Sequence, residues 1–212
     1  MNQETPIPER RRDPEHTRNV LLDAAFEEMH ENGYRAASLD KIYEVSGVTR
    51  GALYHHFGGK LELGYAVVDE RIVPRFRELY IQPFLRSDDI RNALLEISNR
   101  MKEEFNNTNI LLRGCPVNNL TQEMSGIDEG FRLRLAALLE EWRDAVAVCI
   151  RRSQARGTVR KDIEPLEAAT FMVAAFEGAI GFAKNAQDTA PFELCRGGLG
   201  LYVQALSSEN TS

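Results

Sequence analysis

Apolar residues recur three and four positions apart along most of this chain, and no stretch sustains the alternation of apolar and polar residues that marks a half-buried strand. The pattern predicts an all-α fold of about nine helices. We expect them at residues 15–32, 39–46, 50–56, 60–80, 89–106, 117–124, 128–155, 165–186 and 191–206. Pro74 should kink the helix at 60–80, because a proline removes a backbone hydrogen bond inside a helix, and Pro83 should mark the break that follows.

The expected helices at 39–46 and 50–56 are short and separated by a tight turn, which is the layout of a helix-turn-helix. Ser38 and Thr49 precede them as N-caps, and Gly47 lies where the first helix must stop. Leu53 and Phe57 should form the buried side of the second helix, which in this motif enters the major groove of DNA. The residues expected to contact DNA are Ser38, Thr49, Arg50, Gly51, Ala52, Tyr54, His55, His56 and Lys60.

The same segment resembles the DNA-binding domain of the TetR family of transcriptional repressors. The resemblance lies in Ser38, Ile42, Gly47-Val48, Gly51, Leu53-Tyr54, His56-Phe57, Lys60 and Leu63, and in the upstream run LLDAAFEEMHENGY at residues 21–34. Two positions depart from the family pattern: Tyr43 stands where a small residue is usual, and Gly58-Gly59 loosens the link to the next helix. The resemblance implies a helix-turn-helix domain with a flexible N-terminal arm at residues 1–59, and a ligand-sensing and dimerisation bundle at residues 60–212.

The resemblance further implies a homodimeric repressor that binds a palindromic operator in double-stranded DNA and is released by a small-molecule effector or by an electrophile or oxidant. In the family such a signal shifts the helix after the DNA-binding domain, here the helix at 60–80, with Gly64 and Pro74 as its soft points. The alternative is a helical protein-interaction module that has lost DNA binding, but such a module would not need the outward-facing residues given above. An enzyme is not expected, because the sequence shows no metal-binding histidine pair, phosphate loop or nucleophile elbow. We expect no metal and no cofactor.

The expected helices at 165–186 and 191–206 carry apolar residues on two faces. On the first helix, one stripe comprises Leu166, Ala169, Val173, Phe176, Ile180 and Ala183, and the other comprises Met172, Ala175, Ala179, Phe182 and Ala186. The second helix adds Leu194, Gly197, Gly198, Leu199, Gly200, Leu201, Val203 and Leu206. A helix that is apolar on two sides is buried on two sides, so we expect a homodimer in which these helices pack on their symmetry mates. A central core helix within one subunit is the other interpretation.

The run RGCPVNNLTQEMS at residues 113–125 resembles a segment in a subgroup of TetR-like repressors that includes the N-ethylmaleimide-responsive, electrophile-sensing repressor. The resemblance implies that Cys115 is a sensor at the start of a short helix, whose dipole favours a thiolate, and that Lys184 comes near it. The other interpretation is that Cys115 is a buried packing residue and that Lys184 reaches solvent. Further expected effector contacts are Asn118, Asn119, Glu123, Trp142 and Phe176.

Charge does not by itself indicate a nucleic-acid partner, because the net charge is −6 and residues 1–60 carry eight basic and ten acidic side chains. The arginines at 10–12 form either an arm that reaches phosphates or part of a solvated tail. The three cysteines are widely spaced and odd in number, which favours a reducing compartment. No apolar run approaches the ~20 residues of a membrane span, and no apolar signal region begins the chain. We therefore expect a cytoplasmic protein with no membrane partner.

Overall fold

A computed structural model describes residues 13–105 and 110–208, with side chains for 13–101 and 111–208. This part of the chain is helical apart from loops and one isolated bridge between Val159 and Ser207, so the all-α prediction is confirmed. A continuous helical run from Lys60 to Arg86 is made of α4 (Lys60–Val67), η1 (Val68–Ile72), α5 (Val73–Phe76), η2 (Arg77–Ile81) and α6 (Gln82–Arg86). The other helices are α1 (Pro14–Ala36), α2 (Leu39–Ser46), α3 (Arg50–Phe57), α7 (Ile90–Phe105), α8 (Ile110–Arg113), α9 (Pro116–Met124), α10 (Glu129–Ala155), α11 (Pro165–Ala186) and α12 (Ala190–Ala205).

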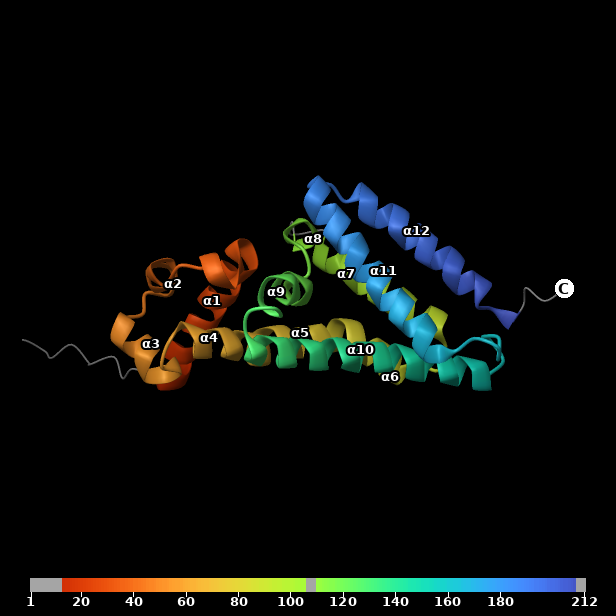
Figure 1. Ribbon diagram of the computed structural model, residues 1–212, viewed down its shortest axis with the longest axis horizontal. Coiled ribbons are helices and arrows are strands. Elements are labelled where there is room, and N and C mark those ends of the chain that lie inside the picture. Colours follow the sequence, from red (N-terminus) through yellow and green to blue (C-terminus); the bar gives the residue numbers. More distant parts are fainter. Residues whose placement is uncertain (1–12, 106–109, 209–212) are drawn as a thin grey trace, which may run out of the picture.

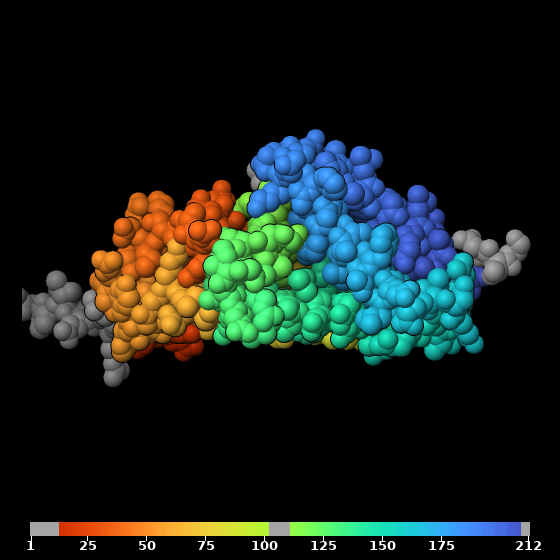
Figure 2. Space-filling view, viewed as in Figure 1, coloured from red at the N-terminus to blue at the C-terminus, as the bar shows by residue number. Residues whose placement is uncertain are grey.

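The helices form an elongated molecule whose two ends are built differently (Figure 1). At one end α1 packs against α2 and α3. Along the length, α10 lies beside the run from Lys60 to Arg86, and towards the other end α11 packs on α10 while α12 packs on α11. Helix α9 contacts both α1 and α10, so it joins the two ends, and Figure 2 shows that these parts form one continuous surface.

The helical run from Lys60 to Arg86 passes through both of its prolines. We expected a break at Pro83, but the helix continues to Arg86. The kink expected at Pro74 stays a prediction. The π-helical segments η1 and η2 each end two residues before a proline, Pro74 and Pro83 respectively. A π-helical turn shifts the hydrogen-bond pattern by one residue, which leaves room for a residue that has no N–H to donate. The break therefore comes later than expected, after α6.

Gly64 on α4 is a tight contact point and not the soft point that we expected. A Cβ atom at this position would lie 2.7 Å from Cε2 of Tyr34 and 2.8 Å from Cζ of Phe131. Tyr34 follows the break in α1, and Phe131 lies in the first turn of α10, with their ring centroids 4.8 Å apart. Glycine is needed here because two aromatic rings from different helices press directly on the α4 backbone.

Helix α11 is long and apolar. By length and composition alone, its 22 residues could span a membrane, which corrects our expectation that no apolar run approached that length. The apolar stripes are divided between the interior and the surface. The stripe members Ala169, Met172, Ala179, Ile180 and Ala183 are buried, whereas Leu166 and Phe182 are exposed. Phe171 on α11 and Leu194 and Leu201 on α12 are exposed as well, so one apolar face of this helix pair is left uncovered.

Candidate DNA-binding surface and effector cavity

Local capping fixes the turn between α2 and α3 as the sequence predicts. The Ser38 hydroxyl accepts a hydrogen bond from the Lys41 backbone N–H at 3.3 Å, and the Thr49 hydroxyl accepts one from Ala52 N–H at 3.4 Å. Gly47 ends α2 with a φ of 65°, in the left-handed region that favours glycine. The two helices therefore begin and end where their caps require, and the predicted helix-turn-helix is present.

The outer face of α3 is polar and closely approachable. Leu53 and Phe57 are buried against the rest of the domain. On the other side, Arg50, Gly51, Tyr54 and His55 are exposed, and Ala52 and His56 are half-buried. A Cβ atom at Gly51 would meet no atom within 4 Å. Polar side chains thus surround Gly51, where the DNA can approach the α3 backbone closely. This arrangement suits contact with DNA phosphates and base edges.

His56 lies at the edge of this face, beside His55, with their ring centroids 5.2 Å apart. Burial lowers the pKa of His56, and the nearby His55 and Arg18 lower it further. His56 therefore favours the neutral form at physiological pH, in which one ring nitrogen donates and the other accepts. The arginines at 10–12 lie outside the described residues.

The junction between α1 and α2 is held from two sides. Lys60 donates from Nζ to the carbonyl oxygens of Arg35 and Ala37, at 3.0 and 2.7 Å. From the other side, the Glu123 carboxylate accepts hydrogen bonds from the backbone N–H groups of Tyr34 and Arg35, both at 2.8 Å. These N–H groups follow Gly33, where α1 is interrupted at a φ of 80°. Lys60 on α4 and Glu123 on α9 thus clamp the segment that leads into the helix-turn-helix.

Helix α1 is also tied to the helical run that follows the DNA-binding helices. Arg71 on η1 donates to Asp23 Oδ1 at 2.6 Å and to Asn19 Oδ1 at 2.8 Å. Arg18 forms a two-pronged ion pair with Glu70. A movement of η1 would therefore carry α1 with it.

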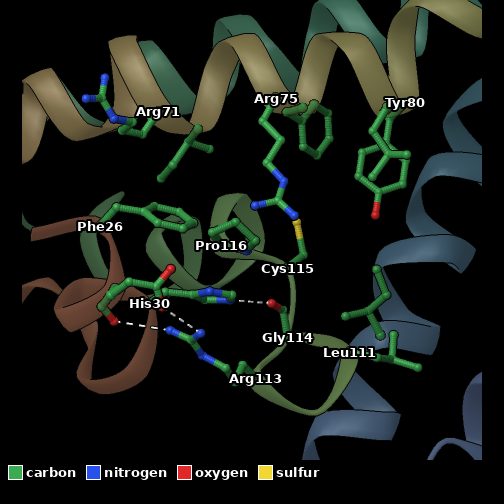
Figure 3. Close-up of a pocket in the computed structure, with 15 residues that line it drawn as sticks. Phe26, His30, Arg71, Arg75, Tyr80, Leu111, Arg113, Gly114, Cys115 and Pro116 are labelled. Carbon is green, nitrogen blue, oxygen red and sulfur yellow. Dashed lines mark hydrogen bonds and ion pairs between the residues drawn. The ribbon is translucent and has the colours of Figure 1, made fainter. Parts of the chain in front are cut away.

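A cavity of about 80 Å³ lies where α1, the run from Lys60 to Arg86 and the segment before α9 meet. Its lining is mostly apolar but includes three arginines. The lining residues are Phe26, Glu27, His30, Arg71, Ile72, Arg75, Phe76, Leu79, Tyr80, Leu111, Arg113, Gly114, Cys115, Pro116 and Ile180. Figure 3 shows the Arg75 side chain reaching across this space toward the sulfur of Cys115. The cavity thus touches both the DNA-binding end and the helical bundle.

The segment that carries Cys115 is held by hydrogen bonds from both sides of the cavity. His30 on α1 donates from Nε2 to the Gly114 carbonyl at 2.8 Å (Figure 3). Burial lowers the pKa of His30, so its ring is neutral. Asn119 donates to the Arg113 carbonyl and accepts from Lys184 Nζ, both at 2.9 Å. A displacement of the segment around Cys115 would therefore disturb hydrogen bonds to both α1 and α11.

Cys115 does not have the environment of a thiolate. Its side chain is 6% exposed. Burial raises the pKa of Cys115 well above its usual range, and the negative charge of Glu177 raises it further. The backbone N–H groups of Asn118 and Val117 lower it, as the helix-start argument predicts, but by less. Lys184 reaches this segment but donates to Asn119, so the expected approach of the lysine to Cys115 is not seen.

The remaining expected effector residues do not line this cavity. Trp142 and Phe176 belong to an aromatic cluster with Phe76 and Tyr80, whose ring centroids lie between 4.9 and 5.6 Å apart. Asn118 accepts a hydrogen bond from Gln122, and Glu123 is engaged at the α1–α2 junction. His30, Arg75, Tyr80 and Glu177 were not among the residues predicted from the sequence. For Glu177 a signal was present, because this acid follows Phe176 in an otherwise apolar stretch of α11.

Comparison with known proteins agrees with this architecture of a helix-turn-helix and a helical bundle. A model described as "Bacterial regulatory proteins, tetR family" matches residues 21–67, and one described as "Tetracyclin repressor-like, C-terminal domain" matches residues 88–199. The chain belongs to the TetR family. It is therefore a transcriptional regulator with a DNA-binding domain, and not an enzyme.

Individual relatives cover most of the chain. It is 35% identical to the transcriptional regulator AcuR of Cereibacter sphaeroides over 164 residues, which are 77% of this chain and 74% of AcuR. It is 25% identical to the transcriptional repressor DhaR of a Mycobacterium species, over 83% of this chain and 86% of DhaR. A crystal structure of a regulatory protein TetR from Rhodobacter sphaeroides superposes with a TM-score of 0.77 at 29% identity, covering 87% of this chain and 97% of the other.

Proposed function

We propose that this protein is a cytoplasmic, homodimeric TetR-type repressor that binds a palindromic operator and is released when a small molecule occupies the cavity. One observation carries the proposal: the cavity is lined jointly by α1, which supports the DNA-reading helix, and by the helical run that leads into the bundle. A ligand placed there must press on both. The separation of the two reading helices in a dimer would then change.

The exposed face of α3 supports the DNA-binding part of the proposal. Thr49, Arg50, Gly51 and His55 would lie nearest the base edges, and Ser38 and Tyr54 would contact phosphates, with Ala52 and His56 at the edge. Lys60 already uses two of its three N–H donors inside the protein. A phosphate contact by Lys60 is thus limited to its remaining donor.

The uncovered apolar face of α11 and α12 supports the dimer. Phe182 is 64% exposed, Leu201 69% and Leu194 78%. A Cβ atom at Gly178, Gly181, Gly197, Gly198 or Gly200 would meet nothing within 4 Å, so another helix can approach this face closely. A two-fold axis here would place two copies of α3 on two half-sites of one DNA duplex.

Transmission from the cavity has two physical routes. Ile72 and Phe76 of the run lie across the cavity from Phe26 and His30 of α1, so a ligand between them pushes α1 and η1 against their mutual ion pairs. The second route runs through α9, which begins after Cys115 and ends at Met124, next to Glu123 and its hold on the α1–α2 junction. Cys115 also gives the signal a covalent route.

The proposal is tested by selecting binding sites for the purified full-length protein from a random-sequence DNA library. We expect a palindrome with half-sites one helical turn or more apart. Placing the selected site in a promoter upstream of a reporter gene should lower expression when the protein is present. The double variant Arg50→Ala and Tyr54→Ala, on the exposed face of α3, should abolish both effects while it still folds.

Failure to enrich any site, with wild type and variant behaving alike, would overturn the repressor assignment. That outcome would favour the alternative of a helical interaction module that has lost DNA binding. Enrichment of a site that raises expression would keep DNA binding and overturn repression alone.

A further inference from the structure

Glu177 is a buried acid with no hydrogen-bond partner among the described residues. It lies on α11 and is 9% exposed. Both of its carboxyl oxygens are buried, and neither accepts a hydrogen bond. A carboxyl group removed from water without a donor is energetically unfavourable, and burial raises the pKa of Glu177 to about 7. Unsatisfied buried polar groups are rare in folded proteins, and ionisable groups that burial perturbs concentrate at functional sites.

The register of α11 turns Glu177 toward the cavity. Ile180 and Lys184 follow Glu177 by three and seven residues, so the three side chains form one stripe on the helix. Ile180 lines the cavity. Lys184 packs on another lining residue, because a Cβ atom at Gly114 would lie 2.8 Å from the lysine Cδ. Lys184 is exposed whereas Ile180 and Glu177 are buried, so the stripe leads from the surface past the cavity to the carboxyl group.

The part of the cavity that faces α11 is apolar. Tyr80, Leu111 and Ile180 line it, and Figure 3 shows Tyr80 and Leu111 beside the ribbon of α11. The ring centroid of Tyr80 lies 5.5 Å from that of Phe176, the residue before Glu177. The cavity measures about 80 Å³. Because a cavity of about 150 Å³ holds benzene, this one suits a smaller molecule, such as a chain of a few carbon atoms.

The charges around the cavity disfavour a ligand that carries a full charge. The carboxylate of Glu177 would repel an anion. A cation would meet Arg71, Arg75 and Arg113, which line the same cavity. Arg71 and Arg113 already form ion pairs with carboxylates of α1, so an anion gains little from them. An uncharged group that donates a hydrogen bond avoids both costs, and donation to a carboxylate is stronger than donation between neutral groups.

We propose that the cavity binds a small aliphatic alcohol, whose hydroxyl group lies beyond Ile180 and donates a hydrogen bond to the carboxylate of Glu177. The inference rests on the proposed function, since it names the chemical class of the effector. The hydroxyl group supplies the donor that Glu177 lacks, and the carbon chain packs on Tyr80 and Leu111. The bound alcohol would join α11 to the helical run from Lys60 to Arg86, which carries Tyr80 and leads back to the DNA-binding helices.

Trp142 provides a signal for binding at this place. It is the chain's single tryptophan and is buried on α10. Its ring centroid lies 5.6 Å from that of Tyr80 and 5.6 Å from that of Phe176. A molecule that packs on Tyr80 and reaches the residue after Phe176 must disturb this ring cluster. The tryptophan emission of the protein should therefore change when the site fills.

The test compares butan-1-ol with its isomer methyl propyl ether, which has the same size but no O–H group. Dissociation constants for the full-length protein are measured by ligand-observed NMR at pH 8, where a carboxyl group with a pKa of about 7 is mostly ionised. Wild type should prefer the alcohol on the order of tenfold or more and should change its tryptophan emission on binding it. Glu177→Leu removes the acceptor and keeps an apolar side chain, so the two isomers should then bind equally well.

Glu167→Leu is the matched control, because it makes the same exchange at an exposed position of the same helix. It should keep the preference for the alcohol. Equal binding of the two isomers by wild type, or a preference that survives in Glu177→Leu, would overturn the inference. Tighter binding of butylammonium or butyrate than of butan-1-ol would overturn it as well, and so would alcohol binding that leaves the Trp142 emission unchanged.

The two proposals fail separately, because these affinities are measured without DNA. A protein that binds its operator but does not distinguish the isomers would lose the alcohol site and keep the repressor assignment. A protein that prefers the alcohol through Glu177 but enriches no DNA sequence would keep the site and lose the repressor assignment.

Discussion

At the scale of single residues, position in the fold decides what a charged side chain does. Lys184 and Glu177 lie two helical turns apart on α11, and the sequence alone singles out the lysine because the resemblance pairs it with Cys115. In the structure the lysine donates to Asn119 at the surface, whereas burial and, of these two charges, that of Glu177 raise the pKa of Cys115. Composition and periodicity show which residues are charged, but which one meets Cys115 depends on how α11 packs against the segment before α9.

Replacing Glu177 by glutamine should stabilise the protein at alkaline pH and have little effect at acid pH. The folded-state pKa of about 7 lies above the ordinary value of 4.5, so the unfolded chain loses this proton first as pH rises. Wild-type stability therefore falls between about pH 4.5 and 7 and stays lower above it. The difference in unfolding free energy should approach about 3 kcal/mol above pH 7. Urea denaturation of both proteins at pH 5 and pH 8 measures it, and equal differences at the two pH values would contradict the argument.

Arg50 and Lys60 should differ in how they affect DNA binding. Arg50→Ala should relax sequence preference at one base position, costing about 1–3 kcal/mol at the preferred base, because an exposed arginine on α3 reads a base edge. Lys60→Ala should weaken binding to all sequences and reduce the salt slope by about one if its remaining donor meets a phosphate. The two effects are separated by measuring the affinity of each variant for the operator and for operators with one changed base pair, at several salt concentrations. An unchanged salt slope with reduced thermal stability would assign Lys60 to the clamp on Arg35 and Ala37 alone.

At the scale of elements, the sequence predicted regular helices well and their interruptions less well. The ranges for α2 and α11 match the structure, because an N-cap and a stop signal flank α2 and Pro165 begins α11. The run from Lys60 to Arg86 was misjudged, since the π-helical segments that accommodate Pro74 and Pro83 leave no mark in apolar periodicity. The outward face of α3 was predictable from Leu53 and Phe57. The cavity was not, because it depends on contacts between residues about 80 positions apart, such as His30 and Gly114.

Helix α9 should couple the cavity to the helix-turn-helix through Glu123. Glu123→Gln removes the charge from two hydrogen bonds to backbone N–H groups, which should cost about 1–3 kcal/mol. We expect weaker operator binding and a smaller loss of binding after alkylation of Cys115, because the α1–α2 junction is then already loosened. Gln122→Ala, a change at an exposed position of the same helix, is the control. If both variants respond to alkylation like wild type, the signal travels through the α1–η1 contacts instead.

At the scale of the whole molecule, the two helix-turn-helix domains of a dimer must be held at a fixed separation. We expect the uncovered apolar face of α11 and α12 to form the dimer interface that holds them. Leu201→Glu, at a side chain 69% exposed in one subunit, would bury a carboxylate in the proposed interface. A penalty of about 3 kcal/mol raises the dimer dissociation constant roughly a hundredfold. Sedimentation should show monomers at concentrations where wild type is dimeric, and operator affinity should fall with dimer content.

Leu95→Glu is the matched control for this face, because Leu95 is 61% exposed on α7, which lies outside the α11–α12 pair. It should leave the dimer and operator binding intact. The comparison also separates assembly from folding, since both variants add the same charge to an exposed leucine of one subunit. A dimer that tolerates Leu201→Glu but is broken by Leu95→Glu would place the two-fold axis on α7. A two-fold axis on α7 would change the relative positions of the two α3 helices. The expected spacing of the operator half-sites would change with them.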